Sequence, residues 1–470
     1  MIEGLKPYAE YKESGQEWLG KIPGHWELKL GQSAYLKRKV QNIGLKEKTV
    51  LSLSYGRIKV KPTDKQHGLV PESYETYQIV KAGNVIVRGT DLQNDRTSLR
   101  IGIARNDGII SSAYLCLEAR ASIIPKFGYE ILNAFDLTKA IYRYGSGLRQ
   151  NLDHGEIKRL PIFLPPIEEQ AAIVRFLDHA NRKIDGFIRA KRKLIALLGE
   201  QKQAIIHHAV TRGLNPDVPL KPSGIPWLGD IPAHWEVLRA KQVCSRIVDC
   251  KNRTPEHVSD TDFIVVRTTN IRHGLFSLTG SYSTDRRSYE TWTERGAPKV
   301  GDVFFTREAP VGEACLVPDL KNLCMGQRMM YFRPNPAVLD PEFLLHSIYG
   351  PIVRTYIEHV ANGSTVGHLR LGQVTALPLL WCQLDEQRDI VRHIHRESAP
   401  LVTAISRTER EIALMQEYRT RLTADIVTGK LDVREAAAKL PELPVEAPQA
   451  GADEDVDDAA IAEDAETEDT

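Results

Sequence analysis

One phrase of the sequence occurs twice, and the distance between its copies constrains the fold more than any other feature. Residues 14–27 are SGQEWLGKIPGHWE, and residues 223–236 are SGIPWLGDIPAHWE. At the constant shift of 209, fourteen of the 25 positions between 4 and 28 are identical. Solenoid units recur at much shorter periods, of about 20–50 residues. The spacing therefore indicates a duplicated half-protein, and 470 residues are enough for two or more hydrophobic cores.

Each copy of the phrase is followed, after a domain-sized interval, by a long segment with heptad periodicity. In residues 166–212 and 383–431, apolar side chains recur every seven residues, and a second row follows four residues after the first. The two segments share one register at a shift of 217, including the polar positions Lys191 and Thr408. We predict two long helices that pair through Leu177, Ile184, Ile188, Ile195, Leu198, Ile205, Ile394, Leu401, Ile405, Ile412, Met415 and Leu422.

Pro400 is the discordant residue of the second segment. An interior proline removes one backbone hydrogen bond and clashes with the preceding turn. We therefore expect a kink or a break near residues 398–400.

The segments between phrase and helix contain short alternating runs separated by Gly, Asn and Asp, such as YQIVKAGNVIVRG and APKVGDVFFTRE. The predicted fold class is α+β. Two mainly β, α+β domains are separated by two long antiparallel helices that form a coiled coil, in a pseudo-twofold circular arrangement. The expected order is an N-terminal segment 1–27, domain 28–165, helix 166–212, linker with the second phrase 213–236, domain 237–382, helix 383–431 and a disordered acidic tail 436–470.

Charge and cysteine content limit the partners and the compartment. Residues 441–470 contain twelve Asp or Glu and no Lys or Arg. Residues 1–440 thus carry 62 Lys or Arg against 49 Asp or Glu, a formal charge of +13, which is compatible with a polyanionic partner. The six cysteines form no CxxC pair, which favours reduced thiols in the cytosol. No stretch has the roughly 18 apolar residues that a membrane span needs.

Motifs of catalysis are missing from the sequence. It has no GxxxxGK[ST] phosphate loop, no Asn-Pro-Pro-aromatic motif of base-modifying methyltransferases, and no spacing typical of a metal site. We expect neither catalytic nor metal-binding residues, and we interpret the chain as a binding protein.

Polar loops within the two domains are the candidate binding surfaces. Arginine can bind guanine through two hydrogen bonds and Asn can bind adenine, whereas Lys, Ser and glycine-rich backbone hold phosphates. The candidate DNA-binding residues of the first domain are Tyr55, Arg57, Lys59, Arg88, Arg96, Arg100 and Arg149. Those of the second domain are Arg267, Asn270, Arg272, Arg286, Arg287, Arg307 and Arg370.

Several motifs together resemble one family, the specificity (S) subunits of type I restriction-modification systems. They are IPGHWE with IPAHWE, LPIFLPPIEEQAAIVRFLD at 160–178 with LPLLWCQLDEQRDIV at 377–391, and AVTRGL with IVTGKLDV at the helix ends. The NIRHG and KVGDVFFTR stretches are similar to that family's target-recognition domains. The resemblance covers nearly the whole chain except the acidic tail.

The resemblance implies a non-catalytic, sequence-specific DNA-binding subunit in the prokaryotic cytoplasm. Each target-recognition domain would recognise one half of a bipartite, asymmetric double-stranded DNA site, and the helix pair would set the spacing. Two methyltransferase (M) subunits that use S-adenosylmethionine would modify an adenine in each half-site. Restriction (R) motor-nuclease subunits that use ATP and Mg²⁺ would cut unmodified DNA. No cofactor is expected in this chain itself.

Two other interpretations remain open at this point. One is a catalytic DNA methyltransferase or nuclease with built-in recognition domains, against which the missing motifs argue. The other is a coiled-coil scaffold without a role in DNA binding, which predicts that DNA of mixed sequence competes as well as any target.

Overall fold

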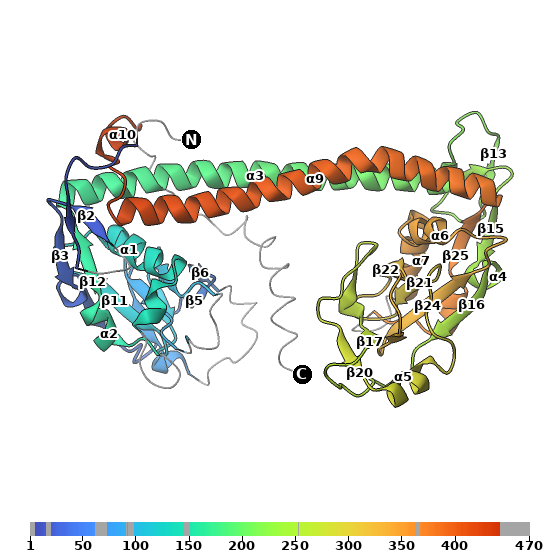
Figure 1. The fold of residues 1–470 in the computed structure, drawn as a ribbon, viewed down its shortest axis with the longest axis horizontal. Coiled ribbons are helices and arrows are strands. Elements are labelled where there is room, and N and C mark those ends of the chain that lie inside the picture. Colours follow the sequence, from blue (N-terminus) through green and yellow to red (C-terminus); the bar gives the residue numbers. More distant parts are fainter. Residues whose placement is uncertain are drawn as a thin grey trace. The chain divides into compact units, whose positions relative to one another are not determined.

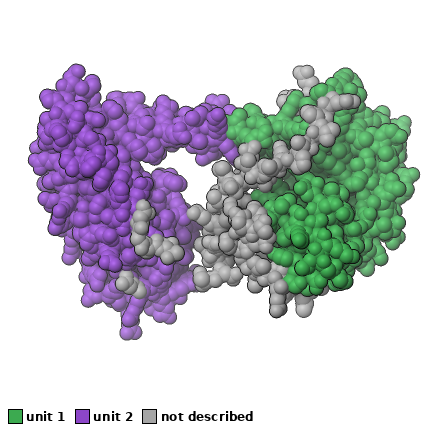
Figure 2. All heavy atoms as spheres, turned by 180° about the vertical axis from the view of Figure 1, so that it is seen from behind, with its two compact units in different colours: residues 1–190, 411–470 green, residues 191–410 purple. Residues whose placement is uncertain are grey.

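A computed structural model describes residues 5–15, 20–61, 73–90, 92, 98–144, 151–251, 253–361 and 367–441. The chain divides into two compact units, shown in Figure 2. Unit 1 contains residues 1–190 and 411–470, and unit 2 contains residues 191–410. Both boundaries fall inside the long helices α3 and α9 (Figure 1), so each unit contains one part of each helix.

The elements of unit 1 are mostly short strands. They are β1 (Tyr11–Glu13), β2 (Lys21–Pro23), β3 (Glu27–Leu30), β4 (Tyr35–Arg38), β5 (Leu51–Ser54), β6 (Arg57–Val60), β7 (Gln78–Val80), β8 (Val85–Val87), β9 (Ile101–Ile103), β10 (Gly108–Ile110), β11 (Leu115–Ala119) and β12 (Pro161–Leu164), with helices α1 (Pro125–Leu137), α2 (His154–Arg159) and α10 (Arg434–Ala438).

Unit 2 has the same character. Its strands are β13 (Leu220–Pro222), β14 (Asp230–Pro232), β15 (Glu236–Arg239), β16 (Cys244–Asp249), β17 (Phe263–Val266), β18 (Ile271–Arg272), β19 (Leu275–Phe276), β20 (Tyr282–Thr284), β21 (Val303–Thr306), β22 (Ala314–Leu316), β23 (Leu323–Met325), β24 (Met329–Pro334) and β25 (Pro378–Trp381). Its helices are α4 (Ala240–Val243), α5 (Arg286–Thr293), α6 (Pro341–Ile348), α7 (Pro351–Ala361) and α8 (Leu371–Thr375).

Both units are built around the same four-stranded antiparallel sheet. Its order is β4-β11-β8-β9 in unit 1 and β16-β24-β21-β22 in unit 2. Each unit therefore mixes helices with antiparallel strands, which is the mixed α and β content expected from the sequence.

The turn before the third strand of each sheet shows the duplication at the level of single hydrogen bonds. In unit 1 the Lys81 amide donates to the Asn84 side chain at 2.9 Å, and in unit 2 the Lys299 amide donates to the Asp302 side chain at 3.0 Å. Gly83 and Gly301 adopt left-handed φ values of 91° and 89°, which glycine tolerates without steric cost. These two turns belong to the similar runs KAGNVIV and KVGDVFF of the sequence.

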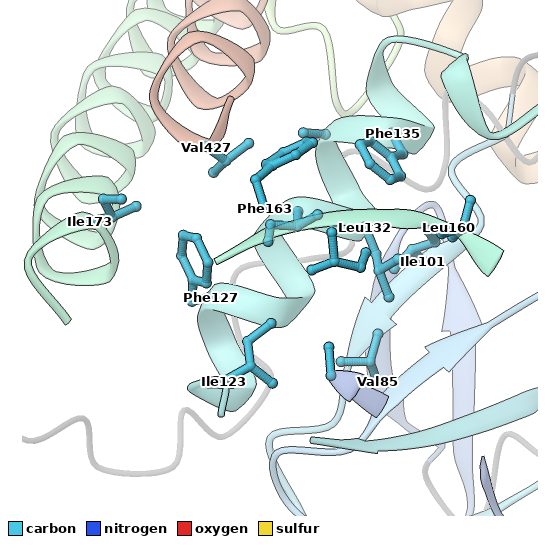
Figure 3. Packing of buried hydrophobic residues seen from close by; sticks show 14 of the residues in the cluster. Val85, Ile101, Ile123, Phe127, Leu132, Phe135, Leu160, Phe163, Ile173 and Val427 are labelled. Carbon is cyan, nitrogen blue, oxygen red and sulfur yellow. The ribbon is translucent and has the colours of Figure 1, made fainter. Parts of the chain in front are cut away.

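Helices cover the sheet and bury its apolar face. In unit 1, Phe127, Leu132 and Phe135 of α1 pack against strand residues such as Val85 (Figure 3). In unit 2, α6 contacts β21 and β22 of the sheet, and α6 and α7 share one core with β21 and β24. Complete burial of a large apolar side chain stabilises the fold by roughly 1.5–3 kcal/mol.

The peripheral strands differ between the units. Unit 1 adds the hairpin β5–β6 and the pair β10–β7. Unit 2 adds a three-stranded sheet of order β20-β17-β23, in which β17 and β23 are parallel, and the hairpin β18–β19. This divergence explains why the sequences of the two segments resemble each other only weakly.

The long helices are α3 (Ile167–Arg212) and α9 (Leu384–Val427). In unit 1 the start of α3 lies against the end of α9, where Asp185 and Arg419 form an ion pair. In unit 2 the end of α3 and the start of α9 share a core through Ile206 and Ile394. The two helices therefore run antiparallel within each unit.

Burial along the predicted seam varies with position. Leu177, Ile184, Ile188, Ile394 and Leu422 are buried. The remaining predicted seam residues, Ile195, Leu198, Ile205, Leu401, Ile405, Ile412 and Met415, are half-buried. Most of the buried positions belong to the main cores of their units, where strands and shorter helices also cover the long helices. A partner helix alone covers only one face of a helix.

Of the kink or break expected near Pro400, the break is wrong, because α9 is continuous from Leu384 to Val427 with Pro400 inside it, whereas the kink stays a prediction. Pro400 is exposed, and so is Arg396, whose carbonyl loses its intrahelical partner. Water can hydrate such a carbonyl, and this reduces the cost of an interior proline.

The repeated phrase forms the same junction in both units. In unit 1, Trp26 is fully buried and its Nε1 donates to Glu169 Oε1, in the first turn of α3, at 2.8 Å. His25 Nε2 lies 2.7 Å from the other oxygen of Glu169. Gly429, just after the end of α9, packs against Trp26.

The junction of unit 2 repeats this arrangement with the helices exchanged. Trp235 is buried and donates to Glu386, in the first turn of α9, at 3.0 Å, while His234 lies 2.9 Å from the same carboxylate. Gly213, just after the end of α3, packs against Trp235. Each copy of the phrase thus connects the end of one long helix to the start of the other, which is why it occurs once per unit.

Candidate nucleic-acid interface

The hairpin β5–β6 presents three of the candidate residues of unit 1. Ser54 and Arg57 are paired across a two-residue turn in which Tyr55 and Gly56 have φ values of 45° and 76°. Both positive values are typical of a type I′ turn. Tyr55 is 45% exposed at the tip, and Arg57 is exposed while Lys59 is half-buried.

Successive side chains of β6 point to opposite faces of the hairpin, so its cationic and apolar residues lie on different faces. Arg57 and Lys59 lie two residues apart, on one face of β6. Ile58 points to the other face and packs against the cluster that contains Leu51 and Ile86. The strand therefore presents cationic side chains on a supported surface.

Arg100 has an internal role. It is fully buried, its Nη1 donates to the Thr90 carbonyl at 2.6 Å, and its Nε donates to the Tyr142 hydroxyl at 3.2 Å. Arg88 is half-buried, and its carbonyl accepts a bond from Arg100. Arg96 and Arg149 lie outside the described residues.

In unit 2, Asn270 and Arg307 likewise serve the fold. Asn270 is 1% exposed, and its side-chain amide donates to the carbonyls of Ser277 and Thr279, both at 2.9 Å. Arg307 is 7% exposed and forms an ion pair with Asp249 at 3.0 Å. Buried polar groups need such partners, so both residues hold loops in place.

The other candidates of unit 2 lie at or near its surface. Arg267, Arg286, Arg287 and Arg370 are exposed, and Arg272 is half-buried on β18. Arg286 forms an ion pair with Glu290 along α5 at 2.9 Å. Both α5 and β20 lie on the side of unit 2 away from its part of the long helices (Figure 1).

Two basic hollows contain residues that the sequence analysis missed. In unit 2, Lys251, Arg253 and Arg295 surround a hollow of about 560 Å³. In unit 1, Lys37, Arg120 and Lys158 line one of about 370 Å³. In the sequence, the hollow of unit 2 is indicated only by the pair of cations that follows a strand-like run at 244–249. Its third cation, Arg295, lies more than 40 residues away.

The hollow of unit 2 lies next to candidate DNA-binding residues, whereas the hollow of unit 1 lies away from the hairpin β5–β6. The hollow of unit 1 lies beside β4, at one edge of the sheet, whereas the hairpin β5–β6 contacts β9 at the opposite edge. Burial and the nearby Lys158 and Lys37 lower the pKa of His154 there. The hollow of unit 2 shares helix α5 with Arg286 and Arg287, so it lies next to exposed candidates.

The cysteines form no disulfide bonds, and burial keeps several of their thiols protonated. All six cysteines are free, and burial raises the pKa of Cys244, Cys315 and Cys324 to about 12, so these thiols stay protonated. Among the described residues, no group of His, Cys, Asp or Glu is arranged to hold a metal ion. In the same part of the chain, no helix is long and apolar enough to cross a membrane.

Comparison with known proteins gives consistent results. No protein-family model matches the chain. The putative type I restriction enzyme MjaX specificity subunit of Methanocaldococcus jannaschii is 20% identical over 451 residues, which cover 92% of this chain and all of the relative. The type I restriction enzyme MjaVIII specificity subunit of the same organism is 22% identical over 336 residues, or 70% of this chain and 75% of the relative.

The fold also matches a solved structure. A chain from a study of complex assembly and conformational transition in a type I R-M system superposes with a TM-score of 0.57 at 15% identity, covering 86% of this chain and 98% of that chain. Over nearly its whole length, the chain is therefore similar to type I restriction enzyme specificity subunits.

Proposed function

We propose that residues 28–165 and 237–382 are two target-recognition domains, each of which recognises one half of a bipartite DNA site. The chain is the DNA specificity subunit of a type I restriction-modification complex and has no catalytic role of its own. One observation carries the two-domain proposal. The units share a sheet and a junction, yet they differ in the loops and peripheral strands that present Tyr55, Arg57 and Arg286. A conserved frame with divergent surface loops is what recognition of two unlike half-sites requires.

The polar surface of each domain fits this role. Exposed arginines can bind guanine in the major groove, and lysines and backbone amides can hold phosphates. Among the described residues, the proposal uses Tyr55, Arg57, Lys59, Arg88, Arg267, Arg272, Arg286, Arg287 and Arg370. Arg100, Asn270 and Arg307 are occupied by internal bonds, and Arg96 and Arg149 lie outside the described residues.

The spacer helices 166–212 and 383–431 set the distance between half-sites in this proposal. A helix of the 46 residues of α3 is about 69 Å long at about 1.5 Å per residue. One turn of DNA is about 34 Å. Helices of this length therefore suffice to place two domains over major-groove sites separated by one turn or more.

The same helices offer a surface for the methyltransferase subunits. Phe187, Leu194 and Leu197 recur at intervals of seven and three residues on α3 and are 40%, 40% and 51% exposed. On α9, Leu414 is 62% exposed. Apolar side chains that recur on one face of a helix and remain in contact with water are typical of a protein interface. S-adenosylmethionine, and ATP with Mg²⁺, would then be bound by the methyltransferase and restriction subunits in the cytoplasm.

Domain exchange tests the assignment of one half-site per domain. Residues 28–165 are replaced by the corresponding domain of another specificity subunit, and the sites methylated by the assembled complex are mapped in genomic DNA. We expect one half-site to change completely and the other to stay as it was, because bases are contacted locally. A change in both half-sites would contradict the proposal.

Lengthening the helices tests their role as spacers. One heptad is inserted into α3 and one into α9 at matching positions of the seam, which preserves its register. Seven residues add about 10 Å, so we expect the spacer between half-sites to lengthen by about three base pairs at about 3.4 Å each. Methylation mapping of this variant provides the readout, and an unchanged spacer would rule out the spacing role.

A further inference from the structure

The basic hollow of unit 2 lies where two chain segments end close together. Lys251 and Arg253 follow the end of β16, and Thr291, Trp292 and Arg295 come from the end of α5 and the residue two positions beyond it. These side chains surround a hollow of about 560 Å³ that is open to solvent. We call the hollow and these five residues the α5 groove.

Contacts within the groove hold the two segments together. The indole Nε1 of Trp292 donates to the carbonyl of Arg253 at 3.0 Å, which ties the end of α5 to the segment after β16. The ammonium group of Lys251 lies 6.0 Å from the centre of the Trp292 ring, at the limit of a cation–π contact. These two contacts hold Lys251 and the backbone of Arg253 beside the end of α5.

The floor of the groove is electrically neutral. Asp249 is its acidic lining residue, and Arg307 forms an ion pair with it at 3.0 Å, with side chains that are only 16% and 9% exposed. The charge that remains comes from Lys251, Arg253 and Arg295. Lys251 has a competing partner on the rim, the exposed Glu294, at 3.0 Å. Among the described residues, no carboxylate forms an ion pair with Arg253 or Arg295.

Arg253 and Arg295 line the same hollow without an ion-pair partner among the described residues, and Lys251 has only the exposed Glu294, so the groove favours an anion with several charges. The location identifies the class of anion. Helix α5 carries Arg286 and Arg287 at its exposed start and the groove at its end, so a ligand held in the groove fixes the position of those arginines. Contacts to phosphates position a protein on DNA, whereas contacts to bases determine the sequence.

We propose that the α5 groove binds the sugar-phosphate backbone of DNA next to the half-site of unit 2, through Lys251, Arg253 and Arg295, and thereby positions α5 for base contact. This inference rests on the proposed function and deepens it by separating positioning residues from base-contacting ones. Since phosphates are the same in every sequence, the groove contributes affinity and register without sequence preference.

The test uses the full-length chain assembled with its methyltransferase subunits. Affinity for target DNA and for DNA of mixed sequence is measured over a range of salt concentrations for R253Q/R295Q. Two lost phosphate contacts should weaken both affinities by a similar factor, on the order of tenfold, and reduce the slope of log K against log salt by about 1.8. The methylated sequence should not change. The control K241Q/K299Q removes two exposed lysines of the same unit outside the groove, and its affinity and salt slope should match the wild type.

A second variant predicts the opposite direction. E294Q removes the rim carboxylate that competes for Lys251, so DNA affinity should rise, by roughly twofold to fivefold at low salt. If the Lys251–Glu294 pair mattered only for folding, E294Q would lower affinity and the melting temperature together, and that result would overturn the assignment.

The remaining outcomes distinguish this inference from the proposed function. If the wild-type complex prefers its target but R253Q/R295Q keeps the same affinity and salt slope, the groove does not bind DNA. If the variant alters the methylated sequence, the groove contacts bases, and the phosphate assignment is wrong. If the wild-type complex shows no preference for any sequence, the proposed function fails, while a uniform loss of affinity in the variant still supports the groove.

Discussion

Substitution of Gly429 by alanine is expected to destabilise unit 1 by about 2–5 kcal/mol, whereas Gly213→Ala should cost unit 2 only about 1–2 kcal/mol. Both glycines follow a long helix with left-handed φ values, 78° and 70°. An alanine in that left-handed conformation costs about 1–2 kcal/mol of stability at either site. The difference lies in the space that a Cβ atom would meet.

At position 429 a Cβ atom would lie 2.7 Å from Cγ of Pro23 and 3.2 Å from the ring of Trp26. A proline ring cannot rotate away, and Trp26 is fully buried, so the backbone must shift. At position 213 the nearest atoms are those of Trp235 at 3.3 Å and Glu386 at 3.4 Å, which a few tenths of an ångström would relieve.

Denaturant unfolding of the full chain, monitored by hydrogen exchange in each unit, measures the loss of stability in Gly429→Ala and in Gly213→Ala. Gly186→Ala is the matched control, because Gly186 lies inside α3 with open space around its Cβ position. An alanine there should be neutral or stabilise the helix by up to about 1 kcal/mol. Equal costs at positions 429 and 213 would show that the two junctions are not packed as described.

Removal of the Glu169 carboxylate should have the second large effect, a loss of about 2–5 kcal/mol in Glu169→Ala. Glu169 is 4% exposed and accepts hydrogen bonds from the hydroxyl of Tyr8 at 2.7 Å and from Nε1 of Trp26 at 2.8 Å. Both donors are buried, and each would lose its acceptor at a cost of about 1–3 kcal/mol. Burial, together with the nearby Glu169, raises the pKa of Tyr8, so its hydroxyl remains a donor at neutral pH.

The equivalent residue of unit 2 provides the internal comparison. Glu386 is 29% exposed and accepts from Trp235, and position 217, which corresponds to Tyr8 at the shift of 209, is an aspartate. Glu386→Ala should therefore cost less, about 1–2 kcal/mol. Tyr8→Phe in the Glu169→Ala background should recover part of the loss, since one orphaned donor disappears. Additive costs in that double variant would contradict a shared buried network.

The sequence alone does not distinguish an exposed arginine from one that serves the fold. The chemistry of Arg57 and Arg307 is the same in the sequence, and both lie in polar, strand-rich segments. In the structure Arg57 is exposed on a hairpin, while the buried Arg307 forms an ion pair with the half-buried Asp249. Whether a guanidinium faces water or a carboxylate depends on which distant segment packs beside it, and no local pattern contains that information.

The α5 groove could not be predicted from the sequence for the same reason. Its cations come from segments more than 40 residues apart, and the bond from Trp292 to the backbone of Arg253 brings them together. Pro400 does not break α9, because the cost of an interior proline depends on whether the freed carbonyl can be hydrated.

From the sequence alone, the duplication, the two helical segments with their common register, and the similarity to type I specificity subunits could be recognised. Those features are periodic or repeated, so local side-chain chemistry specifies them. The tertiary structure alone decided that Trp26 and Trp235 each donate to a glutamate in the first turn of a long helix, and it decided which arginines are surface groups and which are internal partners. Burial and pairing depend on contacts between residues that are far apart in the chain, and those contacts exist only after folding.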